Sequence, residues 1–476
     1  MAADSIRFVL NGEVVTADVT DPTRTVLQFL REDLRLTGSK EGCAEGDCGA
    51  CTVLLDGKPI NACIQFLPTI DGKELLTVEG LRGPDGALHP VQQAMVAEHG
   101  SQCGFCTPGF VMSLYALYCS NDAPTRREID DALAGNLCRC TGYRPIIAAA
   151  RAMYQGDEKR LVGAGAEVLR KVTRKDDLAI ESGGHRFFAP RSIETFAGLL
   201  EQYPDATILA GGTDIGLWVT KQYRELGTIL YTGHVEAMTS LETSATHIEI
   251  GAAVTLSDAI PAIVAHYPGL DEMFRRFASP PIRNAGTLGG NVANGSPIGD
   301  SMPALMVLGA TLVLRKGDQE RELPLEAFYH DYQITDLQPG EFVARVRVPL
   351  AERDLVVSSQ KWSKRFDQDI SAVCTAYRLE LDGDNVAAFR MACGGLAATI
   401  KRAAACEAAV AGKPWNAATI ESACAALAQD FSPITDARAT ADIRLLAVQN
   451  LLRRFYLETT GEAPETVYTY GRQGSR

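Results

Sequence analysis

Four cysteines near the start of the sequence are spaced in a way that suits an inorganic cluster. They form the series Cys43-x4-Cys48-x2-Cys51-x11-Cys63. A C-x4-C-x2-C run with a distant fourth cysteine is the ligand pattern of plant-type [2Fe–2S] clusters. Gly46 and Gly49 lie between these ligands, where the backbone must turn sharply and bring N–H groups close to sulfur. The spacing predicts an iron–sulfur site, whereas a zinc ribbon would pair two C-x2-C units.

A second cysteine set lies downstream. It combines Cys103-x2-Cys106 with Cys138-x-Cys140. Such a quartet could hold zinc or iron. The C-x-C half is tight for tetrahedral zinc, and a cluster motif already lies upstream, so we favour a second [2Fe–2S] cluster.

The residues after each cysteine pair carry helix-start signals. Thr107 and Thr141 follow the last cysteine of their pairs, and each precedes a proline and an apolar run. Threonine favours the N-cap and proline the first helical turn, so we expect two helix N-termini facing an anionic cluster. Between them, Thr125 and Glu128 have the spacing of a capping box that opens a further helix.

Composition limits the classes of function. The 476 residues exceed what one core can organise, and the net charge of −13 without a Lys/Arg block argues against a nucleic-acid partner. The longest apolar stretch, around residues 110–119, is too short to span a membrane, and the start lacks a secretory pattern. We therefore expect a cytoplasmic protein. Five further cysteines are expected to be buried thiols in a reducing compartment, namely Cys119, Cys374, Cys393, Cys406 and Cys424.

The pattern of elements along the chain indicates several domains. Asn11-Gly12 and Asp56-Gly57 follow β-type runs and predict hairpins, while the apolar periodicity of residues 25–36 predicts a helix. A second helix is expected over residues 401–411. The expected divisions are a small sheet domain (1–81), a helical domain (82–155), a linker with room for one short helix (156–184), a glycine-rich α/β domain (185–355) and a last α/β segment (356–476).

Two glycine-rich segments could bind phosphate. One spans residues 208–215 and the other residues 287–300. Glycines let backbone N–H groups close on a pyrophosphate. Neither segment has the spacing of a Rossmann or P-loop motif, so composition alone leaves a turn as good an interpretation as a phosphate site.

Taken together, these motifs carry a family resemblance over nearly the whole chain. The sequence resembles the small subunits of bacterial xanthine dehydrogenases, within the molybdenum hydroxylase family. The matching segments are Glu41 to Cys51, Gln102-Cys-Gly-Phe-Cys106, Cys138-Arg-Cys140, Ala210-Gly-Gly-Thr213, Thr287-Leu-Gly-Gly-Asn291 and Lys364 to Ile370. The resemblance implies a multidomain α+β chain. Its parts would be a β-grasp ferredoxin-like domain, a helical [2Fe–2S] domain, an FAD domain of the vanillyl-alcohol-oxidase/CO-dehydrogenase type and a C-terminal α/β domain of the CO-dehydrogenase flavoprotein type.

Cofactor-binding residues also follow from the resemblance. It implies FAD contacts from Ile208, Leu209, Ala210, Gly211, Gly212, Thr213, Asp214, Ile215, Phe277, Thr287, Leu288, Gly289, Gly290, Asn291, Asp300, Val343 and Lys361. Phe277 would stack on the flavin ring, and Tyr332 matches a residue near the NAD+ site of the family.

The resemblance further implies a division of labour between two subunits. The long relatives continue into a molybdopterin domain, which these 476 residues do not contain, so hydroxylation is expected on a large partner subunit. Gln102 would approach the pterin, and two small with two large subunits would form a heterotetramer. Electrons from xanthine or hypoxanthine would pass through both clusters and FAD to NAD+. Open alternatives are the same subunit of an aldehyde or N-heterocycle hydroxylase, a stand-alone flavin and iron–sulfur carrier, and a structural zinc protein.

Overall fold

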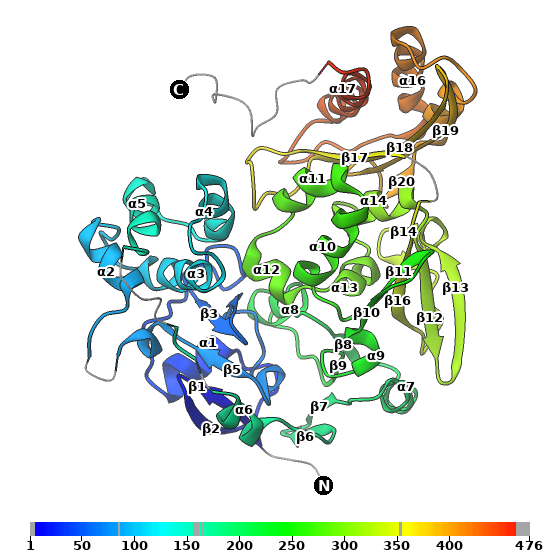
Figure 1. The fold of residues 1–476 in the computed structure, drawn as a ribbon. Helices are drawn as coiled ribbons and strands as arrows, with labels where there is room; N and C mark the ends of the chain where they lie inside the picture. Colours follow the sequence, from blue (N-terminus) through cyan, green and yellow to red (C-terminus); the bar gives the residue numbers. More distant parts are fainter. Residues whose placement is uncertain (1–4, 84–85, 156–160, 164, 352–354, 463–476) are drawn as a thin grey trace. The chain divides into compact units, whose positions relative to one another are not determined.

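The computed structural model describes residues 5–83, 86–155, 161–163, 165–351 and 355–462 (Figure 1). The chain forms two compact units. Unit 1 comprises residues 1–239, 255–257 and 278–287, and unit 2 comprises residues 240–254, 258–277 and 288–476. Each unit combines sheets with helices, which confirms the predicted multidomain α+β fold class.

Unit 1 begins with a five-stranded sheet in the order β2-β1-β5-β3-β4. Both predicted hairpins are present, because β1 pairs antiparallel with β2 and β3 with β4. The expected helix over residues 25–36 is shorter and divided, with Thr25 capping a turn of α-helix that continues as a π-helix. The elements are β1 (Ser5–Leu10), β2 (Glu13–Asp18), α1 (Val26–Gln28), η1 (Phe29–Asp33), β3 (Thr52–Leu55), β4 (Lys58–Asn61), η2 (Leu67–Ile70), β5 (Glu74–Leu76) and η3 (Val78–Leu81).

A helical domain follows in the same unit. Almost every residue of its second helix from Gly109 to Tyr118 is buried, which makes α3 the centre of the domain. Thr125 and Glu128 form the predicted capping box at the start of α4. The helices are α2 (Pro90–Ala97), α3 (Thr107–Ser120), α4 (Arg126–Leu133) and α5 (Arg144–Ala152). Of the five additional cysteines, Cys119 lies here and is exposed, contrary to expectation, because it sits near the C-terminal end of α3.

The last part of unit 1 is a four-stranded sheet in the order β6-β7-β9-β8, with β7, β9 and β8 parallel. The segment expected as a linker contains one short helix, α6, and also β6, which pairs with β7. The elements are α6 (Ala166–Val172), β6 (Leu178–Ser182), β7 (His185–Ala189), α7 (Ile193–Gln202), β8 (Thr207–Leu209), α8 (Ile215–Thr220), β9 (Thr228–Tyr231), α9 (Glu236–Thr239) and α12 (Pro280–Ala285).

Unit 2 contains an antiparallel sheet in the order β10-β11-β16-β12-β13 and a separate hairpin, β14-β15. The strands are β10 (Leu241–Thr243), β11 (His247–Gly251), β12 (Thr311–Lys316), β13 (Gln319–Pro324), β14 (Tyr329–Asp331), β15 (Ile334–Thr335) and β16 (Phe342–Pro349). The helices are α10 (Leu256–His266), η4 (Pro268–Leu270), α11 (Asp271–Arg276), α13 (Leu288–Asn294), α14 (Ser301–Leu308) and η5 (Leu325–Ala327).

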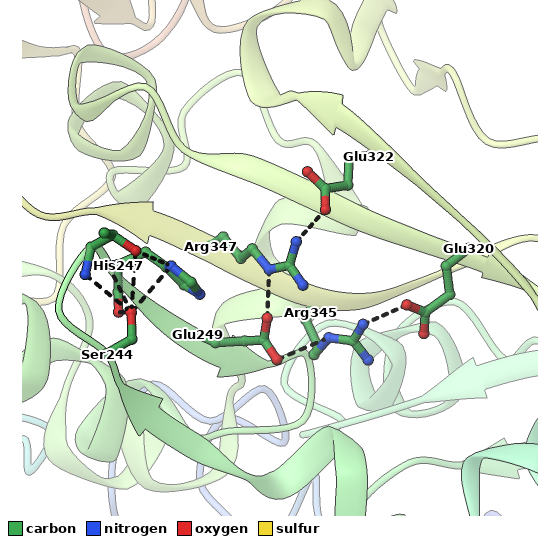
Figure 2. Close-up of polar contacts among 8 residues, drawn as sticks. Ser244, His247, Glu249, Glu320, Glu322, Arg345 and Arg347 are labelled. Carbon is green, nitrogen blue, oxygen red and sulfur yellow. Dashed lines mark hydrogen bonds and ion pairs between the residues drawn. The ribbon is translucent and has the colours of Figure 1, made fainter.

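One face of this sheet carries a network of alternating charges (Figure 2). Glu249 on β11 forms ion pairs with Arg345 and Arg347 of β16, with N–O distances of 3.2 and 2.5 Å. The same two arginines reach across to Glu320 and Glu322 on β13. Partly exposed pairs of this kind contribute little stability individually, about 0–1 kcal/mol each. Because each arginine bridges two strands, the network instead favours one register of the sheet.

The remainder of unit 2 is a sheet in the order β17-β18-β19-β20, with helices packed on it. The helix expected over residues 401–411 is present but begins three residues later, after the short strand β20. Cys374, Cys393, Cys406 and Cys424 are buried here, as expected. The elements are β17 (Val356–Trp362), β18 (Val373–Asp382), β19 (Asn385–Gly394), β20 (Lys401–Arg402), α15 (Ala404–Val410), α16 (Ala417–Asp430) and α17 (Ala441–Thr459).

Candidate functional site

The first cysteine set gathers around a hairpin in unit 1. Cys51 directly precedes β3 and Cys63 follows β4, and these strands pair Thr52 with Asn61. The hairpin therefore returns Cys63 to the side of Cys51, and the Ala62 N–H donates to the Cys51 carbonyl at 3.4 Å. The long sequence gap before the fourth cysteine is thus the length of one hairpin.

The loop from Cys43 to Cys48 wraps backbone N–H groups around one sulfur. The N–H groups of Glu45, Asp47 and Cys48 donate to Cys43 Sγ at 3.4, 3.3 and 3.3 Å. Gly46 takes φ 81°, in the left-handed region that favours glycine. Backbone donors aimed at sulfur are what a thiolate ligand requires.

The thiols of this set alter one another's ionisation. Hydrogen bonding with Cys48 and Cys63, and then backbone N–H groups, lowers the pKa of the Cys43 thiol well below its ordinary value. Hydrogen bonding with Cys43 raises the pKa of Cys48, and hydrogen bonding with Cys43 and Cys51 raises that of Cys63. The four sulfurs therefore share one small space. This donor set fits a [2Fe–2S] cluster, in which each iron takes two cysteine sulfurs.

The second cysteine set gathers in the helical domain. Cys103 Sγ and Cys140 Sγ lie 3.5 Å apart, and both residues are exposed. Cys138 Sγ lies 3.1 Å from Thr141 Oγ1 and accepts the Thr141 N–H at 3.4 Å. Burial, together with a hydrogen bond to Cys138, raises the pKa of Cys106 to about 12. The structure thus brings all four cysteines of this set into one group, which also fits a [2Fe–2S] cluster.

The helix starts beside this set differ from the prediction. Cys106 is itself the N-cap of α3, which makes Thr107 the first helical residue, and Tyr143 is the N-cap of α5. Tyr143 has φ 64°, and its hydroxyl accepts the Cys138 N–H at 3.0 Å. Thr141 is not the cap because α5 begins only at Arg144; its hydroxyl lies beside the Cys138 sulfur and accepts the Tyr143 N–H at 3.2 Å.

A backbone hydrogen bond connects the two cysteine sets. The Leu137 N–H donates to the Cys48 carbonyl at 3.0 Å, and Leu137 directly precedes Cys138. Next to it, Asn136 Nδ2 donates to the Gly49 carbonyl at 3.2 Å. Sequence reasoning missed Asn136 and Leu137, although their position just before a Cys-x-Cys motif was an available signal.

Two glycines, Gly109 and Gly49, allow the two cluster domains to approach this closely. A Cβ atom on Gly109 would lie 2.0 Å from the Gly49 carbonyl oxygen, and one on Gly49 would lie 2.1 Å from the Gly135 carbonyl oxygen. Any side chain at position 109 or 49 would therefore collide with backbone. The close approach of Gly49, Gly109 and Gly135 holds Leu137 against Cys48.

The first glycine-rich segment connects β8 to α8 in unit 1. Residues 208–215 are mostly half-buried, and Gly212 turns the chain with φ 70°. A Cβ atom on Gly211 would lie 2.0 Å from the Ala285 carbonyl oxygen. Backbone packing against α12 is therefore sufficient to require glycine at 211, and the FAD contacts of this segment stay a prediction.

The second glycine-rich segment, residues 287–300, is a loop only in its second half. Residues 288–294 form helix α13 in unit 2, whereas residues 295–300 lie outside helices and strands. A Cβ atom on Gly289 would lie 2.4 Å from Ala252 Cα, so close packing on the sheet outweighs the low helix propensity of glycine. Asn291 Oδ1 accepts the Ser301 hydroxyl at 2.6 Å. Whether these residues contact FAD also stays a prediction.

Two further residues with an expected FAD contact form a buried ion pair. Lys361 Nζ lies 2.7 Å from Asp300 Oδ2, and each side chain is only 2% exposed. The other oxygen of Asp300 accepts the Ser371 hydroxyl at 2.6 Å. Val343, which was also expected to contact FAD, is buried on β16, and that contact stays a prediction.

The aromatic candidates have different surroundings. Phe277 is half-buried at the end of α11, and Tyr332 is 57% exposed in the β14-β15 hairpin. Beside Phe277, the buried Arg276 donates to the Lys361 and Phe366 carbonyls, each at 2.9 Å, and lies over the Phe366 ring. Arg276, which sequence reasoning missed, therefore fixes the segment that follows Lys361.

Two kinds of site are absent from the part of the chain that the structure describes. There, no group of three or more His, Cys, Asp or Glu side chains could hold a single metal ion. The two cysteine sets need not meet that condition, because each iron of a [2Fe–2S] cluster takes only two protein sulfurs. No helix in the same residues has the length and apolarity to cross a bilayer.

Comparison with protein families assigns each segment. Residues 8–76 match the 2Fe-2S iron-sulfur cluster binding domain, and residues 77–151 match the [2Fe-2S] binding domain. Residues 181–351 match the FAD binding domain in molybdopterin dehydrogenase, and residues 358–459 match the CO dehydrogenase flavoprotein C-terminal domain. The chain belongs to the molybdenum hydroxylase family. As a member, it is an iron–sulfur and flavin electron-transfer module, which confirms the resemblance predicted from the cysteine and glycine motifs.

Individual relatives of this molybdenum hydroxylase module agree with the assignment. Xanthine dehydrogenase of Emericella nidulans is 33% identical over 90% of the chain, and xanthine dehydrogenase/oxidase of Gallus gallus is 30% identical over 95%. The chain spans only 36% and 40% of these two proteins.

Solved structures of the family resemble the module in fold. A chain of carbon monoxide dehydrogenase from Hydrogenophaga pseudoflava aligns with TM-score 0.54 and 26% identity, over 56% of this chain and 94% of its own length. A chain of quinoline 2-oxidoreductase from Pseudomonas putida 86 aligns with TM-score 0.53 and 24% identity, over 58% and 97%.

Proposed function

We propose that this chain is the electron-transfer subunit of a xanthine dehydrogenase. A partner subunit with molybdopterin would hydroxylate xanthine or hypoxanthine, and this chain would deliver the electrons to NAD+. Two [2Fe–2S] clusters, FAD and NAD+ supply the redox chemistry of this proposal, and the protein supplies position and electrostatics. The cluster ligands would be Cys43, Cys48, Cys51 and Cys63 for one site and Cys103, Cys106, Cys138 and Cys140 for the other.

The observation that carries this proposal is the hydrogen bond from the Leu137 N–H to the Cys48 carbonyl, at 3.0 Å. It joins a ligand of the first set to the residue before Cys138, a ligand of the second. Two redox sites held so directly against each other by backbone suit sequential one-electron transfer.

The surroundings of each cysteine set support an order of transfer. Cys103 and Cys140 are exposed, with Phe105 and Leu137 also exposed at 47% and 42%, so this set would face the molybdenum partner. Gln102 lies in the same exposed segment and would approach the pterin. The first set instead contacts α8, which directly follows the glycine-rich segment proposed for FAD. The second set would therefore receive electrons and the first would pass them to flavin.

The assignment to xanthine rests on relatives such as the two xanthine dehydrogenases at 33% and 30% identity, although aldehyde oxidase 2 of Macaca fascicularis is similar at 29%. The structural neighbours include proteins titled carbon monoxide dehydrogenase and quinoline 2-oxidoreductase, so the same subunit of another molybdenum hydroxylase is the second candidate. Identifying the chain that co-purifies separates the two candidates. With the first candidate, xanthine dehydrogenase, we also propose a heterotetramer of two small and two large subunits, located in the cytoplasm.

Reduction of the isolated holo-chain by NADH tests the proposed route. We expect electron paramagnetic resonance to show two distinct [2Fe–2S] signals, because one set lies in a sheet-domain loop and the other at helix ends. Cys48→Ser should remove one signal and Cys138→Ser the other, each with loss of half the iron and acid-labile sulfide. Cys119→Ser, which changes an exposed cysteine outside both sets, should keep both signals.

A single signal in the wild-type chain would contradict the two-cluster proposal, and zinc in place of iron would favour the structural alternative. Turnover of xanthine by the isolated, molybdenum-free chain would contradict the division of labour between subunits.

Tyr332→Ala is expected to weaken the use of NAD+ selectively. With 57% of its surface exposed, Tyr332 is free to contact a nicotinamide nucleotide and contributes little to the core. We expect reoxidation of the dithionite-reduced chain by NAD+ to slow about tenfold, equivalent to about 1.4 kcal/mol of lost contact, while reoxidation by an artificial dye is unchanged. Stopped-flow absorbance measures both rates. Tyr332→Phe, which keeps the ring, should retain most of the NAD+ rate, whereas equal slowing with both acceptors and loss of FAD would indicate a packing role.

A further inference from the structure

The end of helix α8 is bonded to the ligand loop of the first cysteine set. Thr220 Oγ1 donates to the Ala44 carbonyl at 2.7 Å, and Lys221 Nζ donates to the Cys43 carbonyl. The last residue of the helix and its C-cap therefore hold two consecutive carbonyls of the loop. The Cys43 sulfur itself is the one that receives three backbone N–H groups.

Helix α8 also packs tightly on the other end of this cysteine set. A Cβ atom on Gly216, inside α8, would lie 2.9 Å from the carbonyl oxygen of Ile64, the residue after Cys63. One on Gly212, in the preceding glycine-rich segment, would lie 3.3 Å from the same oxygen. Close packing at Ile64 and hydrogen bonds at Cys43 hold α8 in one position, so the Lys221 ammonium is fixed beside the ligand loop.

The charges around Lys221 leave its ammonium only partly compensated. Glu45 is its one ion-pair partner among the described residues, at 3.8 Å, and the two side chains are 41% and 42% exposed. A [2Fe–2S] cluster with four thiolate ligands carries net negative charge, and reduction adds one electron to it. A fixed cation bonded to a ligand's own carbonyl stabilises the more negative, reduced state.

We infer that Lys221 raises the reduction potential of the cluster held by Cys43, Cys48, Cys51 and Cys63. Lys221 acts through the Cys43 backbone and so is a positioning residue. This inference rests on the proposed function, since it takes these four cysteines as cluster ligands. A residue at the end of α8, in the segment proposed for FAD, would thus help to set the reduction potential of the neighbouring iron–sulfur site.

The effect of removing this charge should be modest, because both Lys221 and Glu45 are in contact with water and salt. We expect Lys221→Gln to shift the equilibrium of this cluster about threefold toward the oxidised form. At 59 mV per tenfold change for one electron, this is a fall in midpoint potential of about 28 mV. The shift should shrink as ionic strength rises.

Potentiometric titration of the holo-chain, followed by electron paramagnetic resonance, tests the inference. Lys221→Gln should lower the midpoint potential of only the signal that Cys48→Ser removes, and Lys221→Arg should restore it. Thr220→Val deletes the neighbouring hydrogen bond without changing charge and should leave the potential unchanged. Lys175→Gln removes an exposed lysine elsewhere in unit 1 and should also have no effect.

Two results would overturn the inference about Lys221. One is an unshifted potential in Lys221→Gln, and the other is an equal shift in Thr220→Val, which would assign the effect to docking of the helix and not to charge. A wild-type chain that lacks the signal assigned to the first set would instead overturn the proposed ligands. The experiment therefore separates failure of the inference from failure of the proposed function.

Discussion

Replacing Gly109 by alanine should disrupt the contact between the two cluster domains. The added Cβ would lie 2.0 Å from the Gly49 carbonyl oxygen and 3.3 Å from Ala50 Cα, and both belong to backbone that cannot rotate away. Overpacking in a core costs about 1–3 kcal/mol, and a clash with backbone belongs at or above the top of that range. We expect a lower thermal unfolding midpoint and less iron per chain. Electron exchange between the two clusters that the cysteine sets would hold should also be slower.

Gly198→Ala is the matched control for this prediction. Gly198 also lies inside a helix, α7, but its added Cβ would meet nothing within 4 Å. The same substitution should therefore stabilise the chain there by about 1 kcal/mol, because alanine is the better helix former. Equal effects at both positions would contradict the role given to Gly109.

Removing the buried Lys361 ammonium of unit 2 should be similarly damaging. The Asp300 side chain is 2% exposed and has two side-chain partners, Lys361 and Ser371. Lys361→Met leaves this carboxylate with the Ser371 hydroxyl alone. An uncompensated buried charge costs about 3–5 kcal/mol. We expect a clear fall in the unfolding midpoint of the flavin-free chain, measured by calorimetry, and a weaker hold on FAD in the loaded chain.

Two further variants separate folding from flavin binding at this pair. Asp300→Asn combined with Lys361→Met removes both charges and should recover part of the lost stability. Arg126→Met breaks an ion pair of similar length, 2.9 Å, whose side chains are 55% and 51% exposed, and should cost no more than about 1 kcal/mol. An unchanged midpoint in flavin-free Lys361→Met would show that Lys361 serves the cofactor alone.

Local signals in the sequence predicted the local parts of the structure. The hairpins at Asn11-Gly12 and Asp56-Gly57 and the capping box at Thr125 depend on residues a few positions apart, and all three are confirmed. Cysteine spacing also reports local geometry, because a metal cluster limits the distance between its ligands. The fold class and the family followed from these motifs and are confirmed, whereas the ligand sets themselves stay predictions.

The errors arose where specific contacts, local or distant, decide the conformation. Helix α5 begins at Arg144 and not directly after Thr141, whose hydroxyl lies beside the Cys138 sulfur. Residues 288–291 became helical because Gly289 fits closely against Ala252. The bond between Lys221 and Cys43 spans 178 positions of sequence, and no periodicity or turn signal reports a contact at that range.

The meeting of Gly49, Gly109 and Gly135 has a consequence for engineering. Exchanging only residues 86–155 for the corresponding segment of another protein would put foreign backbone opposite Gly49, and any side chain there would separate Leu137 from Cys48. The sheet domain and the helical domain must therefore be transplanted together. In a chimeric electron carrier, the smallest portable part of this chain is the pair of domains, with their interface intact.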